Sequence, residues 1–142
     1  MKTLVIGAAI IDIIMKIKRL PKSGEDILCS ETVSAVGGCA YNVAGTLRGF
    51  GVDHDLFVPV GRGMYGDMIA GDLEKLGYQI LIREEESDNG YCLCLVEEDG
   101  ERTFITVKGA EGRFRPSWFE QLSQDAYDSI YVAGYQVCGT SG

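Results

Sequence analysis

Residues 37–44 have the sequence GGCAYNVA and open a predicted helix that runs from about Cys39 to Phe50. The paired glycines let the chain turn sharply and leave backbone N–H groups uncovered, and the helix directs its positive end to the same place. Asn42, in the first helical turn, can both donate and accept hydrogen bonds. The combination suits a polyhydroxylated or oxyanion ligand, although a plain loop-to-helix turn with Asn42 bonded locally is the structural alternative.

Strands and helices alternate on either side of this segment. Four β-rich apolar stretches predict strands at residues 3–8, 55–60, 79–82 and 129–133. Two more helices are predicted at Tyr65–Leu76 and Ser117–Gln124. Alternation of this kind predicts a parallel sheet with helices on both of its faces.

Two segments, at about 12–35 and 91–108, do not follow this alternation. The first continues the strand-like pattern of residues 10–18 into an exposed stretch at 27–35. The second is a hairpin around Glu98-Asp99-Gly100-Glu101, because Asp-Gly is a favoured hairpin turn. Together the two segments predict a small separate antiparallel sheet.

A second glycine motif, Gly61-Arg62-Gly63-Met64-Tyr65-Gly66, has the G-x-G-x-x-G spacing of dinucleotide-binding folds. It follows a predicted strand and opens a helix, and Glu84 lies about where a ribose-binding acid is expected. Asp67, however, stands in the first turn of that helix, where its carboxylate would repel a pyrophosphate. The motif also follows the second core strand instead of the first. A dinucleotide-binding domain is therefore the weaker alternative to a structural turn or a loop that lines a site.

Composition limits the class of protein. The 142 residues are 46% hydrophobic and 24% charged, which suits one folded domain, and 13 basic against 21 acidic residues give a net charge of -8. An acidic surface argues against general binding of nucleic acid or of anionic membranes. Asp12 interrupts the apolar start of the chain and no apolar run reaches ~20 residues, so we expect a buried first strand and a cytoplasmic protein.

The cysteines predict neither a disulfide framework nor a zinc site. Their number is odd, there is no Cys-x-x-Cys pair, and His54 is the one histidine. The five are Cys29, Cys39, Cys92, Cys94 and Cys138. Cys92 and Cys94 would share one face of a strand, where we expect them as small buried apolar residues.

The pattern Gly37-Gly38-x-Ala40-x-Asn42-x-Ala44, followed at fixed spacings by Gly51 and Gly61, resembles the N-terminal signature of the PfkB (ribokinase-like) carbohydrate kinases. The turn at Pro21–Glu25 and the motif at 61–67 are also similar to that family. The likeness covers essentially the whole chain.

The resemblance implies an α/β fold, a Rossmann-like α/β/α layer with a small antiparallel β lid. Residues 1–142 would be the N-terminal part of this domain, with lid segments at about 12–35 and 91–108. The implied activity is phosphorylation of a sugar or nucleoside hydroxyl with ATP and Mg²⁺. Lid strands have unpaired edges, so the resemblance also implies a homodimer formed through the lid.

The same resemblance assigns four substrate-binding residues. Asp12 would accept hydrogen bonds from sugar hydroxyls, Gly37 and Gly38 would let the backbone approach the sugar, and Asn42 would bind a further hydroxyl. Their shared task is to orient the acceptor oxygen, because phosphoryl transfer depends on positioning and charge stabilisation. From the residues alone, Asp12 could equally be a solvated carboxylate at a strand end.

The resemblance also implies parts that this chain lacks. The chain stops at Gly142, about half the usual family length, and contains neither the Gly-Ala-Gly-Asp motif with its general base nor the Asn-x-x-Glu motif linked to magnesium and phosphate. We therefore expect no catalytic residue and no metal site within the chain, an ATP site mostly outside it, and no activity of these residues alone. A non-catalytic sugar-binding or interaction module of the same fold is the alternative.

Several positions leave the substrate open. Ribose-specific members of the family have Asn, Lys and Glu where this chain has Ile10, Cys39 and Tyr135, so ribose is not specifically expected. The sequence assigns no role to three further side chains, which are Tyr41, Tyr91 and Arg102.

Overall fold

The computed structural model describes residues 1–137 and confirms the alternation of strands and helices. The strands are β1 (Thr3–Ile6), β2 (Ile10–Lys16), β3 (Glu31–Gly37), β4 (His54–Phe57), β5 (Pro59–Val60), β6 (Ile82–Arg83), β7 (Tyr91–Val96), β8 (Arg102–Val107) and β9 (Ser129–Val132). The helices are α1 (Cys39–Gly49), α2 (Met64–Lys75), α3 (Pro116–Phe119), α4 (Gly134–Val137) and the 3-10 turns η1 (Ala110–Gly112) and η2 (Gln124–Ala126).

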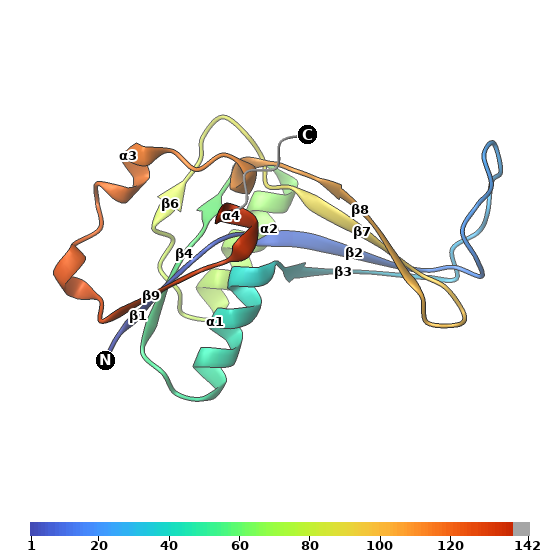
Figure 1. Cartoon of the computed structure of the whole chain (residues 1–142). Helices are drawn as coiled ribbons and strands as arrows, with labels where there is room; N and C mark the ends of the chain where they lie inside the picture. The colour runs from blue at the N-terminus through green and yellow to red at the C-terminus, as the bar shows by residue number, and fades with distance from the viewer. Residues whose placement is uncertain (138–142) are drawn as a thin grey trace.

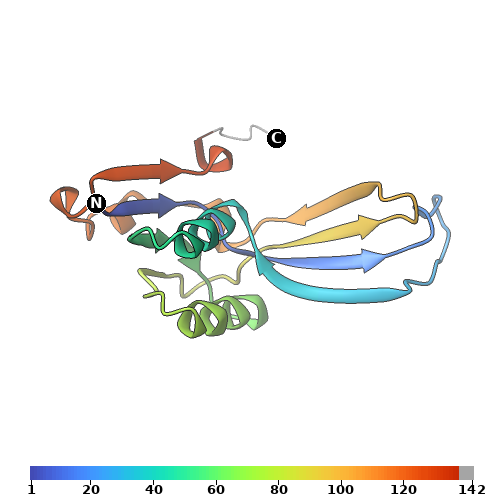
Figure 2. The same cartoon turned by 90° about the horizontal axis from the view of Figure 1, so that it is seen from below.

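The core is a parallel sheet of order β4-β1-β9. β1 is central and apolar on both faces, as a strand buried on both sides requires. Val5 packs on one face against buried residues of α1 and α2, and Figure 2 shows both helices on that side of β1. Leu4 and Ile6 pack on the other face with Phe57 and with the chain between residues 114 and 127. The predicted layered α/β core is thus confirmed.

The helix expected at Ser117–Gln124 is much shorter than predicted. α3 ends at Phe119, and the chain then turns extended at Ser123 before entering η2. Trp118 and Leu122 pack against the second face of the core sheet. A short helix has little stability of its own. The packing of these side chains, and not local helix propensity, therefore decides the path of the backbone after Phe119.

A second sheet projects from the core on one side (Figure 1). Its strand order is β3-β2-β7-β8, and we call these four strands the outer sheet. The two segments that broke the alternation do form it, and two of its three strand pairings are antiparallel as predicted, whereas the third is parallel. β2 and β7 are parallel, whereas β2–β3 and β7–β8 are antiparallel. The reason is topological, because β2 and β7 both run outward from the core and each returns through its own hairpin partner.

Candidate functional site

A cavity of about 850 Å³ lies where the outer sheet meets the start of α1. Its lining comes from the link between β1 and β2, from the first half of β2, from β7 and β8, and from the chain after each of β8 and β9. Three of the four predicted substrate-binding residues line it, namely Asp12, Gly38 and Asn42. The structure thus brings together a carboxylate of β2 and an amide of α1, 30 positions apart in the sequence.

Asp12 lies in the middle of the outer sheet, paired with Ala35 on β3 and Cys92 on β7. It is half-buried, and this burial raises the pKa of its carboxyl above the ordinary value of 3.8. Gly37 is not among the lining residues, but a Cβ at Gly37 would collide with the Asp12 carboxylate. The first glycine of the pair therefore makes room for the acid.

Gly38 is the N-cap of α1 and has a φ of 101°, which side chains rarely allow. A Cβ there would also lie 2.5 Å from the carbonyl oxygen of Ala8. No side chain caps α1, and its first turn contains no acidic residue. The positive end of α1 thus faces the cavity beside the exposed Asn42 side chain.

The outer sheet supplies an apolar wall that the sequence prediction missed. Cys92 and Thr106 pair across β7 and β8, and the Thr106 hydroxyl donates to the Cys92 sulfur at 3.4 Å. Phe104, two residues along β8, also lines the cavity and is 60% exposed. Strand register brings these residues to the site. Sequence analysis could have identified them only by predicting the correct pairing of β2, β7 and β8.

The three side chains left without a role do not line the cavity. Tyr41 donates a hydrogen bond to Asp72 on α2, and burial together with this bond raises the pKa of Tyr41 to about 12. The ring of Tyr91 packs against Tyr65, with their centroids 5.0 Å apart. Arg102 is exposed at the hairpin end of β8. Tyr41 and Tyr91 hold α2 against its neighbours and are not ligand contacts.

The G-x-G-x-x-G motif at residues 61–66 holds a carboxylate of this chain. The Asp88 side chain accepts the backbone N–H groups of Tyr65 at 3.2 Å and Gly66 at 2.6 Å, at the start of α2. A Cβ at Gly63 would collide with the same carboxylate. Asp88 thus occupies the position that a pyrophosphate would need, and the motif serves as a helix cap.

Replacing Asp88 by Ala is expected to lower the free energy of unfolding by about 1–2 kcal/mol, because two helix N–H groups lose their acceptor. Chemical denaturation of the variant and the wild type measures this difference. Asp67→Ala is the matched control, since Asp67 is an exposed acid of the same helical turn. Equal stability of the Asp88 variant and the wild type would contradict the assignment.

Cys92 and Cys94 are buried, as their shared strand face predicts. Both are free thiols, and Cys29 and Cys39 are free as well. Cys138 lies outside the described residues. Within residues 1–137, no group of three or more His, Cys, Asp or Glu side chains is placed to hold a metal ion. In the same part of the chain, no helix is long and apolar enough to cross a membrane.

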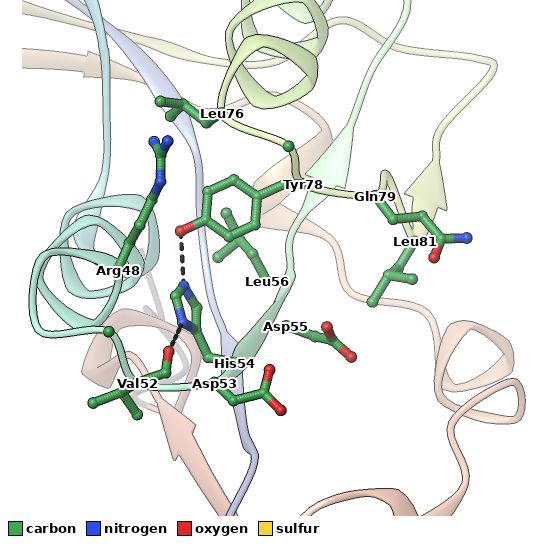
Figure 3. Close-up of a pocket in the computed structure, with 12 residues that line it drawn as sticks. Arg48, Val52, Asp53, His54, Asp55, Leu56, Leu76, Tyr78, Gln79 and Leu81 are labelled. Atoms are coloured by element: carbon green, nitrogen blue, oxygen red, sulfur yellow. Dashed lines mark hydrogen bonds between the residues drawn. The ribbon is translucent and has the colours of Figure 1, made fainter.

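A second cavity, of about 550 Å³, lies between the C-terminal ends of α1 and α2 (Figure 3). His54 and Tyr78 form its centre, with the His54 ring nitrogens 2.7 Å from the carbonyl oxygen of Val52 and from the Tyr78 hydroxyl. Asp55 is bound by Lys2 at 2.9 Å and by the Tyr127 hydroxyl at 2.7 Å. His54 and Asp55 thus each have partners within the protein, and none of the predicted site residues lines the cavity.

Comparison with solved structures defines the fold first. Ribokinase from Giardia lamblia superimposes with a TM-score of 0.82 at 24% identity, over 94% of this chain and 42% of that chain. Arabidopsis thaliana ribokinase complexed with ribose and ATP superimposes with a TM-score of 0.73 at 24% identity, over 94% of this chain and 45% of that one. The core sheet and the outer sheet together thus form a ribokinase-like fold.

The family follows from sequence. The model of the pfkB family of carbohydrate kinases matches residues 1–141, so the chain belongs to that family. "Uncharacterized sugar kinase YegV" of Escherichia coli is 39% identical over 139 residues, which are 98% of this chain and 43% of that protein. The chain therefore spans less than half the length of this relative.

Proposed function

We propose that this chain is the sugar-binding part of a kinase that transfers a phosphoryl group from ATP to a hydroxyl of a sugar or nucleoside. The observation that carries the proposal is the convergence of Asp12, Gly38 and Asn42 on one cavity in a chain of the pfkB family. Residues 1–142 then form the N-terminal part of the kinase domain, and the outer sheet acts as its lid. The ribose in the Arabidopsis ribokinase structure supports the substrate class.

The chemistry of the cavity matches a polyol. An ionised Asp12 accepts hydrogen bonds from sugar hydroxyls, and Asn42 can donate to one hydroxyl and accept from another. Partial burial of Asp12 strengthens these bonds, because the local dielectric is lower than that of water. The Phe104 ring on the outer sheet covers the C–H face of the sugar and excludes water. Together they orient the hydroxyl that accepts the phosphoryl group.

ATP and Mg²⁺ are implied by the family, and the described residues do not fit a site for either. Residues 1–137 hold no cluster of metal ligands, and Asp88 occupies the N-terminus of α2 that a phosphate would need. We propose that the groups that hold ATP and Mg²⁺, and the catalytic base, lie mainly outside these residues.

The four free thiols of the described chain suit a reducing compartment, which supports a cytoplasmic location.

The outer sheet also has the properties of a dimer contact. Its edge strands are β3 and β8, and Val33 on β3 and Ile105 on β8 are 48% and 52% exposed. Unpaired edges with exposed apolar residues favour pairing with a second copy. We propose a homodimer through these strands. Sedimentation velocity of the full-length protein tests this, and a monomer at every concentration would contradict it.

The direct test of the function is a kinase assay of the full-length protein that carries this sequence. ATP consumption is measured against a panel of pentoses, hexoses, sugar acids and nucleosides, and sugar binding is measured by calorimetry. Turnover of at least one sugar or nucleoside is the expected result. Binding without turnover would favour the non-catalytic module, and neither binding nor turnover across the panel would overturn the proposal.

Sugar affinity is expected to fall in mild acid. The pKa of Asp12 is raised by burial, so its carboxylate takes up a proton at a higher pH than an exposed aspartate does. The protonated form loses hydrogen-bond acceptor capacity, and affinity is therefore lost as the pH falls through the raised pKa. Calorimetric titrations from about pH 8 down to about pH 4.5 measure the effect. An affinity that is constant over this range would contradict it.

A further inference from the structure

The outer sheet joins the core through a small number of chain crossings, and two of them lie side by side. β7 begins directly after Gly90, and β8 leads through Lys108 into Gly109. A Cβ at Gly90 would lie 2.8 Å from the backbone nitrogen of Gly109. The two segments therefore cross with their backbones in contact. The β7–β8 hairpin thus leaves and rejoins the core at one point of close backbone contact.

A single buried carboxylate accepts hydrogen bonds from both segments that cross here. Glu111 is only 5% exposed. Its Oε1 accepts the backbone N–H of Gly109 at 2.9 Å, and its Oε2 accepts the backbone N–H of Gly90 at 2.8 Å. Because each oxygen binds a different segment, the carboxylate links the start of β7 to the end of β8.

Asn89 extends this connection into the core. It is 3% exposed, and its amide nitrogen donates to the carbonyl oxygens of Pro59 at 2.9 Å and Ala9 at 3.3 Å. Its amide oxygen accepts the backbone N–H of Gly61 at 2.7 Å. The amide also lies 3.5 Å from Oε2 of Glu111. One buried network therefore links the hairpin to the segment before β2, which carries Asp12.

Glu111 also lines the cavity, but both its oxygens are engaged by backbone N–H groups. We propose that Glu111 is a positioning residue for substrate binding. It fixes the β7–β8 wall, with Cys92 and Thr106, at the distance from Asp12 and Asn42 that a bound sugar requires. This role rests on the proposed function of the cavity.

The test is Glu111→Gln in the full-length protein. Glutamine keeps the size of the side chain, but its NH₂ group would face a backbone N–H, so one of the two bonds is lost. We expect the dissociation constant and KM for the sugar to rise about tenfold, with KM for ATP unchanged. Hydrogen exchange of the Gly90 and Gly109 amides should become faster.

Glu84→Gln is the matched control. Glu84 is likewise 5% exposed, but it bonds Arg115 at 2.8 Å and the backbone N–H of Glu86 at 2.9 Å, and it does not line the cavity. Both variants are expected to lose thermal stability, whereas only Glu111→Gln should lose sugar affinity. An equal change in sugar affinity in the two variants, or no change in either, would overturn the proposal.

Hydrogen exchange in the wild type tests the role even where Glu111→Gln does not fold. The Gly90 and Gly109 amides are expected to exchange slowly and to slow further when the sugar binds. Exchange rates that are the same with and without the sugar would overturn the positioning role alone. A wild type that neither binds nor phosphorylates any sugar or nucleoside would overturn the proposed function, and this role with it.

Discussion

Replacing Asp12 by Asn is expected to lower kcat/KM for the sugar by about 10²–10⁴-fold. Hydrogen bonds to a charged acceptor contribute about 1.5–3 kcal/mol each, and two hydroxyls bound by one carboxylate account for this range. The amide keeps the shape of the side chain but replaces one acceptor with a donor. Steady-state kinetics of the full-length protein with its best sugar measure the loss.

The same substitution is expected to stabilise the fold. Burial raises the pKa of Asp12, so the folded state disfavours the charged carboxylate relative to the unfolded chain. Above both pKa values this penalty is fully present, and the neutral amide removes it. The variant should therefore melt at a higher temperature than the wild type at neutral pH, while it loses activity.

Glu31→Gln is the control for Asp12→Asn. Glu31 is an exposed carboxylate on β3 of the outer sheet, paired with Lys16 at 2.6 Å. Surface ion pairs contribute little, so neither activity nor melting temperature should change measurably. An Asp12→Asn variant that keeps more than about a tenth of the wild-type kcat/KM would show that the carboxylate is not a principal sugar contact.

Local signals in the sequence were sufficient for the core and for part of the site. An apolar run such as residues 3–6 predicts a strand buried on both faces, and Gly37-Gly38 before a helix predicts an uncovered helix N-terminus. The choice of Asp12 came instead from the family resemblance, because the residues alone left open a solvated carboxylate at a strand end. The strand and the helix N-terminus were predicted from neighbours within a few positions.

The rest of the site depends on contacts between distant segments. Cys92 and Thr106 reach the cavity through the register of three strands, and the parallel pairing of β2 with β7 has no local signature. Asp88 and Glu111 bond backbone N–H groups that lie 22 and 21 positions away in the sequence. A carboxylate that binds backbone leaves no pattern in side-chain types, so sequence analysis could not find it.

Replacing Gly66 by Ala is expected to destabilise the fold by about 3–5 kcal/mol, which lowers the melting temperature by about 10 °C or more. A Cβ at Gly66 would lie 2.5 Å from the carbonyl carbon of Gly61 and closer still to its oxygen. The obstacle is buried backbone, which cannot move aside as a flexible side chain would. Thermal and chemical denaturation measure the effect.

Gly71→Ala is a control within the same helix. A Cβ at Gly71 would meet no atom within 4 Å, so alanine there should stabilise α2 by about 0.5–1 kcal/mol through its higher helix propensity. Changes of opposite sign in the free energy of unfolding of the two variants would show that close packing on Gly61, and not helix propensity, explains the glycine at position 66.

If the motif instead existed to bind a phosphate, Gly66→Ala would weaken nucleotide binding and leave the stability of the ligand-free protein unchanged. That outcome would overturn the assignment of the motif to the Asp88 cap.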